Sequence, residues 1–473
     1  MRTIVWFRGK DLRLADHGPL LHALGAGEVI PLFVLDPYFF SRRRARQLPH
    51  RMQFLLDSLA ELRGEIEKRG SRLVLVQGRS VQLVPALVKQ WRADRVVAHR
   101  WVEPFARKRD QLLRAELGER FQLFEGETLL PPGALRTQAG SPYSVFTRFH
   151  RTFMQEWRAD KAAPSPVSLP PLPRDIDLSE APLPHLSDLG ITRNSRLLAG
   201  GVSNARDRLL RFVKQRAKDY GQDRDRMDIS GTSQLSADLK FGLLSPRQVW
   251  NYAEKKVGNS RGGQAFLRQL VWREFAYSSL WDRPELLLEP FRPAYRGFPW
   301  RSDPRQFRLW QQGCTGYPVV DAAARQLLEI GYVHNRARMI AASFLTKHLM
   351  IDYRWGEAHY LKYLTDGDWA QNNAGWQWSA GCGCDAQPYF RVFNPTTQGE
   401  KFDPSGDYVR TWVPELAQLP TKFIHCPSAA PTEVLRSAGI SLGSDYPLPL
   451  VDHRYGRERF LATAAQHIKG PQS

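Results

Sequence analysis

Residues 331–402 gather side chains that a purely structural helix would keep apart. Carboxylates, guanidinium groups, amides and indoles fall within a few predicted helical turns, namely Asp366, Asp368, Arg336, Arg338, Asn335, Asn372, Asn373, Trp369, Trp376 and Trp378. A helix with only a packing role places polar and apolar residues on opposite faces. Asn335 and Arg338 are spaced i, i+3, and Asn372 and Trp376 i, i+4, so each pair shares one side of its helix. A cavity lined in this way suits a large, flat, heteroaromatic cofactor.

Two further segments carry side chains that could bind a ligand. The turn 231–236 reads GTSQLS ahead of a helical pattern, and hydroxyls at a helix N-terminus can hold a phosphate or act as a simple N-cap. In FLRQLVWREF, residues 266–275, Trp272 lies beside Arg273 and one turn after Gln269. Its indole could stack on a ligand ring or fill the core. Both interpretations stay open from these residues alone.

Composition favours a polyanionic partner. The chain has 473 residues, and 67 Lys and Arg against 48 Asp and Glu give a net charge of +19. Nucleic acid is the leading partner for such a charge, and an evenly basic, soluble surface is the alternative. The four cysteines form no C-x-x-C pair, so no metal site is expected. No apolar run reaches membrane-spanning length, and a cytoplasmic protein with reduced thiols is expected.

The elements that must position these residues fall into two groups. Short apolar runs at 3–7, 30–35, 73–76, 96–99 and 121–124 alternate with amphipathic segments such as 52–68, 84–91 and 106–117. This alternation is typical of a doubly wound parallel sheet. Seven prolines between residues 163 and 185 break regular structure, and a helical period dominates afterwards. We therefore predict an α/β domain over 1–130, a linker over 131–195 and an all-α domain over 196–473.

Several motifs are similar, in order and spacing, to the DNA photolyase and cryptochrome family. They are IVWFRGKDLRLADH, GTSQLS, LVWREF, WQQGCTGYPVVDAA, HNRARM, TDGDWAQNNAGWQW and PYFRVFNPTTQGEKFD, and they cover nearly the whole chain. The chain most resembles the class I cyclobutane pyrimidine dimer photolyases. The resemblance implies a Rossmann-like antenna domain followed by a helical domain that binds FAD. It also implies an antenna chromophore of deazaflavin or folate type, or none.

The resemblance assigns roles to individual residues. Those expected around the FAD phosphates are Tyr220, Thr232, Ser233, Leu235, Ser236 and Arg273. Arg338 and Asp366 resemble an ion pair beside the flavin ring, and Asp368 the residue at the ribityl and ring carbonyl region. Asn372 resembles the amide that faces flavin N5. A cation near the pyrimidine edge of the flavin favours the anionic hydroquinone.

The implied reaction is light-driven repair of UV-damaged DNA by a monomer that needs no protein partner. Excited FADH⁻ gives an electron to a cyclobutane pyrimidine dimer, the ring bonds split, and the electron returns. The dimer reaches the cofactor by base flipping, for which photolyases are a standard example. Trp272 and Trp378 are expected to stack on the dimer, while Asn335, Met339 and Gln269 line its pocket. The expected phosphate contacts are Arg336, Arg391 and Lys401.

Two positions depart from the family pattern. Gln269 resembles the (6-4) photolyases and animal cryptochromes, whereas Asn335, within His-Asn-Arg, is of the cyclobutane type. A (6-4) photolyase and a cryptochrome-like photoreceptor are therefore the alternatives. Tyr353 occupies the middle position of the expected electron-transfer triad, between Trp376 and Trp300. A phenol is harder to oxidise than an indole without losing its proton, so flavin photoreduction is expected to be slow or to use another route, for which Trp310 and Trp355 are the candidates.

Overall fold

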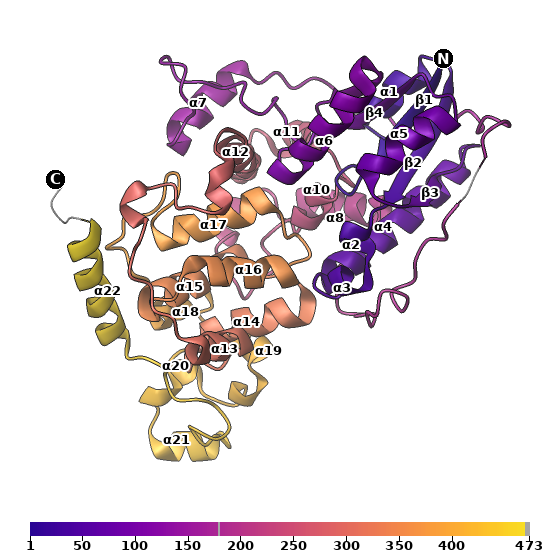
Figure 1. Ribbon diagram of the computed structural model, residues 1–473. Coiled ribbons are helices and arrows are strands. Elements are labelled where there is room, and N and C mark those ends of the chain that lie inside the picture. The colour runs from indigo at the N-terminus through magenta and orange to yellow at the C-terminus, as the bar shows by residue number, and fades with distance from the viewer. Residues whose placement is uncertain (178–179, 469–473) are drawn as a thin grey trace. The chain divides into compact units, whose positions relative to one another are not determined.

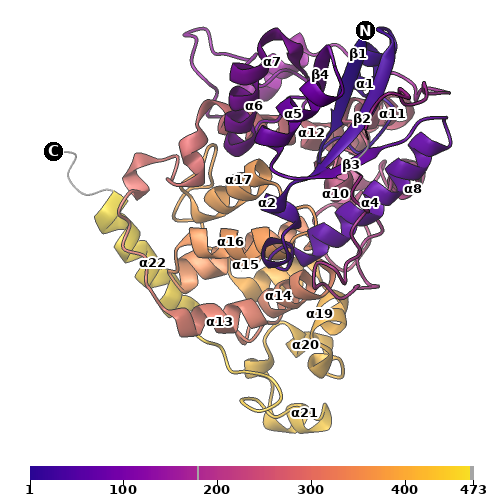
Figure 2. The same ribbon diagram turned by 45° about the vertical axis from the view of Figure 1, so that its right-hand side comes forward.

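A computed structural model describes residues 1–177 and 180–468 (Figures 1 and 2). The chain forms two compact units. The first unit comprises Met1–Lys218, Ser233–Pro284 and Thr365–Gly367, and the second Asp219–Thr232, Glu285–Leu364 and the chain from Asp368 onward. The division does not follow the predicted limits at residues 130 and 195, which stay predictions. Two parts of the predicted linker and helical domain, residues 178–179 and 469–473, lie outside the described residues.

The first unit contains a parallel sheet with the order β3-β2-β1-β4-β5, of which β1 to β4 are labelled in Figure 1. Its strands are β1 (Arg2–Phe7), β2 (Glu28–Leu35), β3 (Val74–Gln77), β4 (Arg95–His99) and β5 (Phe121–Phe124). Ile4 of β1 pairs with Ile30 and Val96 of the flanking strands. The inner strands are almost continuously buried, as expected for a parallel sheet that is covered on both faces. The predicted doubly wound α/β fold is confirmed.

Helices complete the first unit. They are α1 (Gly18–Leu24), α2 (Pro37–Phe40), α3 (Arg42–Ala45), α4 (Pro49–Glu67), α5 (Ser80–Gln90), α6 (Pro104–Leu117), α7 (Phe146–Glu156), α8 (Val202–Gln215), α10 (Ser236–Lys240), α11 (Pro246–Val257) and α12 (Arg261–Asp282). The amphipathic segments predicted at 52–68, 84–91 and 106–117 correspond to α4, α5 and α6. Ser260 caps α12 by accepting a hydrogen bond from the Gly263 N–H at 3.0 Å. This long helix carries Gln269, Trp272 and Arg273.

The second unit is helical, as predicted. Its helices are α9 (Tyr220–Asp223), α13 (Pro304–Gln312), α14 (Pro318–Ile330), α15 (Asn335–Ser343), the π-helical turn η4 (Phe344–His348), α16 (Tyr353–Tyr363), α17 (Trp369–Ala380), α18 (Pro395–Phe402), α19 (Asp407–Trp412), α20 (Thr421–Ile424), α21 (Thr432–Ser437) and α22 (His453–Ile468). Among the described residues, no helix is both long and apolar enough to cross a bilayer.

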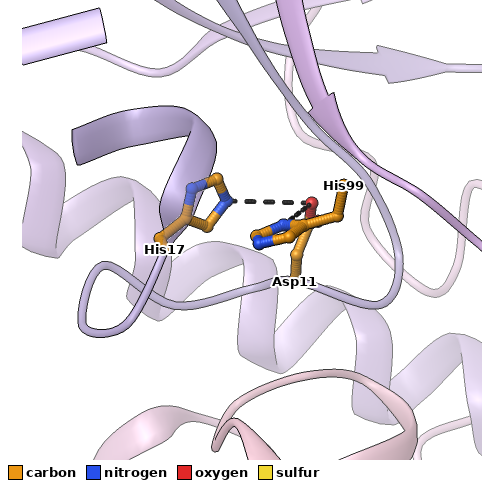
Figure 3. A group of neighbouring side chains, drawn as sticks. All are labelled: Asp11, His17 and His99. Carbon is orange, nitrogen blue, oxygen red and sulfur yellow. Dashed lines mark hydrogen bonds and ion pairs between the residues drawn. The ribbon is translucent and has the colours of Figure 1, made fainter. Parts of the chain in front are cut away.

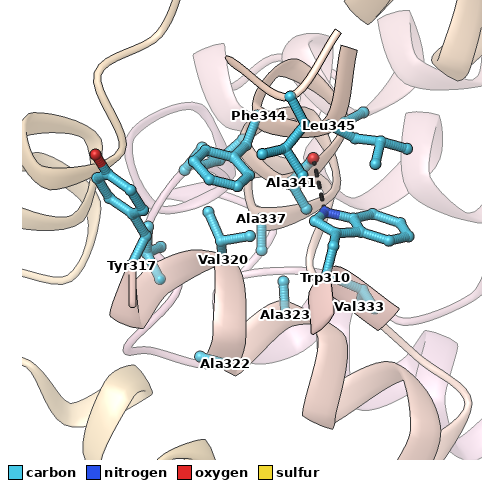
Figure 4. Close-up of a cluster of buried hydrophobic side chains, with 14 of the residues drawn as sticks. Trp310, Tyr317, Val320, Ala322, Ala323, Val333, Ala337, Ala341, Phe344 and Leu345 are labelled. Atoms are coloured by element: carbon cyan, nitrogen blue, oxygen red, sulfur yellow. Dashed lines mark hydrogen bonds between the residues drawn. The ribbon is translucent and has the colours of Figure 1, made fainter. Parts of the chain in front are cut away.

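The core of the second unit forms where α13, α14, α15 and η4 meet (Figure 4). Alanines on α14 and α15, including Ala323 and Ala337, are fully buried and allow the two helices to approach closely. Phe344 and Leu345 belong to the same core. The buried Trp310 indole donates its Nε1–H to the Ala341 carbonyl at 3.3 Å, which satisfies its single polar group. This core holds the start of α15, where several predicted site residues lie.

Candidate functional site

The first turn of α15 presents an amide, a thioether and a guanidinium group. His334 caps the helix because its Nδ1 accepts a hydrogen bond from the Arg336 N–H at 3.2 Å. Asn335 is exposed, and its Nδ2 lies 3.6 Å from the Met339 sulfur, so the structure brings these two predicted pocket residues together. Arg338 is half-buried and donates Nε–H to the Val333 carbonyl at 2.8 Å. Its ion pair with Asp366 stays a prediction.

Helix α17 positions the second group. Asp368 caps it by accepting hydrogen bonds from the Ala370 and Gln371 N–H groups at 3.0 and 3.1 Å. The predicted cofactor role of Asp368 therefore comes in addition to a structural one. One turn later, buried Asn372 donates Nδ2–H to the Glu357 carbonyl at 3.0 Å. This bond fixes the orientation of the Asn372 amide.

Glu357 of α16 contacts two neighbouring residues of α17, Asn372 and Asn373. Its carboxylate accepts a hydrogen bond from the Asn373 Nδ2 at 3.0 Å. Burial nevertheless raises the pKa of the Glu357 carboxyl to about 7, and the Asn373 bond only partly offsets this effect. The residue whose backbone carbonyl holds the Asn372 amide thus also carries a buried proton-binding group. Sequence reasoning missed Glu357, because it lies in an ordinary helical pattern that carries no signal for this role.

The aromatic residues of the predicted electron-transfer triad are not in mutual ring contact within the described chain. Trp376 is 4% exposed and packs against Gly356, where an added Cβ would lie only 2.2 Å from the indole. Tyr353 is 2% exposed, and together with the half-buried Trp300 it borders a cavity of about 250 Å³. The Tyr353 hydroxyl has no hydrogen-bond partner among the described residues, and burial raises its pKa.

A second aromatic series leads away from Trp376. Its indole meets Trp310 edge to face, with ring centroids 6.0 Å apart. Trp310 stacks on Phe307 at 5.7 Å, and Phe307 meets Trp355 edge to face at 5.2 Å. Trp355 follows Tyr353 by two residues, so helical spacing puts it on nearly the opposite side of α16, and Phe307 on α13 links it to Trp310.

The turn before α10 has the hydroxyls that were predicted, but no serine or threonine caps the helix. The N-cap residue is Leu235, and no side chain caps the helix there. Gln234 adopts a left-handed conformation with φ of 54° between Ser233 and Ser236. In the second unit, the Thr232 hydroxyl lies 3.3 Å from the Tyr332 hydroxyl. Burial raises the pKa of Tyr220 in that unit to about 12.

The three predicted site residues on α12 differ in burial and contacts. Gln269 and Trp272 are half-buried on one face, and the Gln269 Nε2 lies 3.4 Å from the Ala265 carbonyl. Arg273 is 9% exposed and donates to the Glu127 carbonyl at 2.8 Å. Its guanidinium also lies 4.6 Å from the centre of the Tyr277 ring. Arg273 thus anchors α12 to the 127–130 segment, and its predicted phosphate contact stays a prediction.

The predicted phosphate-binding cations differ in availability. Arg336 is half-buried and forms an ion pair with Asp225 at 2.8 Å. Arg391 and Lys401 are exposed, and within the described chain neither forms an ion pair with a carboxylate. Trp378 on α17 is half-buried. The two exposed cations are therefore the better candidates for binding DNA phosphates.

One buried cluster in the first unit has the residue types of a metal site. Oxygen and nitrogen atoms of Asp11, His17 and His99 lie within 4.8 Å of one another (Figure 3). His17 Nδ1 accepts a hydrogen bond from the Leu20 N–H, so a neutral His17 carries its proton on Nε2, which faces Asp11 at 3.7 Å. His99 Nδ1 lies 3.1 Å from the same carboxylate oxygen. The arrangement is that of two imidazoles turned toward one carboxylate.

The pKa shifts of the cluster agree with an ionised carboxylate held between two imidazoles. Burial alone would raise the pKa of Asp11, but the two imidazoles, His99 at hydrogen-bond distance and His17 nearby, hold it well below its usual range. Burial also lowers the pKa of His99 to about 3. Gly126 closes over His99, since an added Cβ would lie 2.6 Å from its Nε2. The cluster joins the loop after β1 to β4, which is a structural role.

The side chains described above have the donor types that a flavin dinucleotide needs. The second unit carries a guanidinium group (Arg338), a hydroxyl (Thr232) and an amide with a fixed orientation (Asn372). The first unit carries the hydroxyls of Ser233 and Ser236 on a turn whose helix has no side-chain cap. Cations and hydroxyls suit phosphates, and a fixed amide suits a heteroaromatic ring that both donates and accepts hydrogen bonds. The residues present therefore fit FAD.

Comparison with known proteins identifies two family regions. Residues 3–170 match the model of DNA photolyase, and residues 266–466 match the FAD binding domain of DNA photolyase. The deoxyribodipyrimidine photo-lyase of Agrobacterium fabrum is 41% identical over 98% of this chain and 97% of its own. The Escherichia coli enzyme of the same name is 36% identical over 99% of both chains.

Solved structures agree with these matches. A bacterial class III photolyase from Agrobacterium tumefaciens superposes with a TM-score of 0.91 and 40% identity, covering 99% of this chain and 98% of that one. A Synechocystis cryptochrome gives a TM-score of 0.89 at 31% identity, covering 98% and 99%. Because one similar structure is of class III, the expected assignment to class I stays a prediction. With its FAD-binding domain and near full-length relatives, this chain belongs to the DNA photolyase family of light-dependent DNA-repair flavoenzymes.

Proposed function

We propose that this protein repairs cyclobutane pyrimidine dimers in DNA under blue or near-UV light. The observation that carries the proposal is the first turn of α15, where exposed Asn335 turns its amide nitrogen toward the Met339 sulfur. A thioether is a weak acceptor, so the amide keeps most of its capacity to hydrogen-bond a pyrimidine edge. Relatives named deoxyribodipyrimidine photo-lyase support the same substrate.

When bound, reduced FAD supplies the excited-state electron that opens the cyclobutane ring, and the electron returns afterwards. The residues of this chain bind and orient. Trp272 and Trp378 offer half-buried indoles to the flipped bases, which stack on aromatic faces. Asn372 presents an amide held in place by the Glu357 carbonyl at 3.0 Å. Arg391 and Lys401 contact the phosphates without reading sequence.

A (6-4) photoproduct is the second candidate substrate, and one observation favours it. Gln269 lies one helical turn before Trp272 on the same face of α12, so its amide can reach a base stacked on that indole. An amide can hydrogen-bond a pyrimidine carbonyl but cannot supply a carboxyl proton. A photoreceptor role is the third candidate, because the Synechocystis cryptochrome has the same fold.

Repair of defined oligonucleotides separates the three functions. Purified protein with its flavin prereduced is illuminated with DNA that contains either lesion, and restored bases are measured by chromatography. We expect repair of the cyclobutane dimer and little repair of the (6-4) lesion. Asn335→Ala should lower cyclobutane repair more than Gln269→Ala does. The reverse lesion preference would favour the (6-4) assignment, and normal flavin photochemistry without repair would favour a photoreceptor.

A further inference from the structure

Trp272 is already stacked on another ring of this chain. Phe146, the first residue of α7, lies parallel to the indole, with ring centroids 3.7 Å apart and an interplanar angle of 7°. Phe146 is 1% exposed, whereas Trp272 is half-buried. Phe275 meets both rings edge to face or nearly so, with centroids 5.9 Å away. One face and one edge of the indole are therefore fixed by α7 and α12.

A cation also lies close to the Phe146 ring. Arg268 precedes Trp272 by one helical turn on α12, and its guanidinium carbon lies 4.9 Å from the Phe146 ring centre. Trp272 lies 3.7 Å from the same ring, so Phe146 contacts both side chains. Arg268 is exposed and forms no ion pair with a carboxylate in the part of the chain that the structure describes. The three side chains form a continuous series of cation, phenyl ring and indole.

We propose that Phe146, backed by Arg268, is a positioning residue that holds the Trp272 indole and leaves one face for the lesion. The inference rests on the proposed function, in which Trp272 stacks on the flipped dimer. An indole without this support would lose side-chain freedom when the lesion binds, and that loss weakens binding. A stacked phenyl ring restricts the indole before the lesion binds, so the indole loses less freedom on binding. It also keeps the lesion from stacking on the covered face.

The test compares the affinity of FAD-loaded protein for damaged and undamaged oligonucleotides, measured in the dark by fluorescence anisotropy. We expect Phe146→Leu to weaken binding of the damaged oligonucleotide by about three- to tenfold, because planar stacking is lost while apolar volume is nearly kept. Binding of undamaged DNA should not change. Phe146→Tyr keeps a planar ring and should restore the discrimination. Phe146→Met serves as the second non-planar variant if the leucine variant is unstable.

Phe149 provides the matched control. It is also buried on α7, at 2% exposure; its ring contacts Phe153 and Phe275, and among the described residues it makes no ring contact with Trp272. Phe149→Leu should lower thermal stability comparably and leave lesion discrimination intact. Equal effects of the two leucine variants on discrimination would overturn the positioning role.

Trp272→Ala separates this inference from the proposed function. If that variant loses discrimination while Phe146→Leu and Phe146→Met keep it, Phe146 does not position the indole and the lesion still stacks on Trp272. If Trp272→Ala also keeps discrimination, the lesion does not stack on Trp272. The second result removes the stacking step of the proposed function together with the inference.

Discussion

Glu357 shows how burial tunes a single residue in this protein. Its folded-state pKa of about 7 lies above the ordinary value of a glutamate, so the folded protein holds a proton that the unfolded chain releases. The stability contributed by this group is therefore lost as the pH rises from about 4.5 to about 7. Glu357→Gln keeps an oxygen for Asn373 but does not titrate. Relative to the native protein, the variant should gain about 3 kcal/mol in unfolding free energy between pH 4 and pH 8.

Denaturant unfolding at the two pH values measures this difference. Asp303→Asn is a suitable control, because Asp303 is half-buried and caps α13 from a more solvent-exposed position. A stability difference between Glu357→Gln and the native protein that is equal at pH 4 and pH 8 would contradict the raised pKa.

We expect Tyr353 to limit electron transfer through the predicted triad, and the structure supplies a physical reason. Its buried hydroxyl has no hydrogen-bond partner in the described chain, so no base is placed to take the phenolic proton. Hole transfer from Trp376 to Tyr353 is then uphill. We expect Tyr353→Trp to speed the photoreduction of oxidised flavin and Trp376→Phe to abolish most of it. Repair by prereduced protein should not change in Tyr353→Trp.

Trp310 offers the alternative route, because it contacts Trp376 directly. Steady-state photoreduction, followed by flavin absorbance, should slow in Trp310→Phe. If Tyr353→Trp has no effect while Trp310→Phe slows the reaction, the hole leaves through Trp310. No effect of either change would exclude both routes.

At the scale of elements, the sheet could be predicted because each buried parallel strand reads as a short apolar run. All five predicted strands lie within two residues of the observed ones at either end. The resemblance assigned Asn335 and Met339 to one pocket, and the structure brings them together because i, i+4 residues on one helix are neighbours. Contacts between distant segments could not be predicted in this way. Phe146 on α7 and Trp272 on α12 show this, because no local pattern records their stacking.

The π-helical turn η4 is another element without a sequence signal. It buries Lys347 completely, and the ammonium group donates to the Arg391 carbonyl at 2.8 Å. Burial lowers the pKa of Lys347 to about 7. Between about pH 7 and pH 10.5 the unfolded chain holds a proton that the folded protein has released, so stability contributed by Lys347 rises with pH.

Lys347→Met removes this titration and the bond to the Arg391 carbonyl. From pH 6 to pH 9 the native protein should gain about 2–3 kcal/mol in unfolding free energy relative to the variant. Thermal or denaturant unfolding at both pH values tests the change. Proteolysis of residues 382–393 should also become faster in the variant, because the segment loses its anchor to η4. Equal pH dependence in the two proteins would show that Lys347 titrates normally.

At the scale of the whole molecule, the net charge of +19 should make binding to undamaged duplex DNA fall steeply with salt. Each cation that contacts a phosphate adds to the slope of log K against log salt, and the two predicted contacts at Arg391 and Arg336 should differ. Arg391 is exposed, so Arg391→Ala should lower affinity about equally for any sequence and flatten the slope by about one. Arg336 is already neutralised by Asp225 at 2.8 Å, so Arg336→Ala should change the slope less.

Anisotropy titrations from about 50 to 200 mM salt measure both slopes. An affinity independent of salt would refute phosphate binding, and equal slopes for the two variants would refute the ranking.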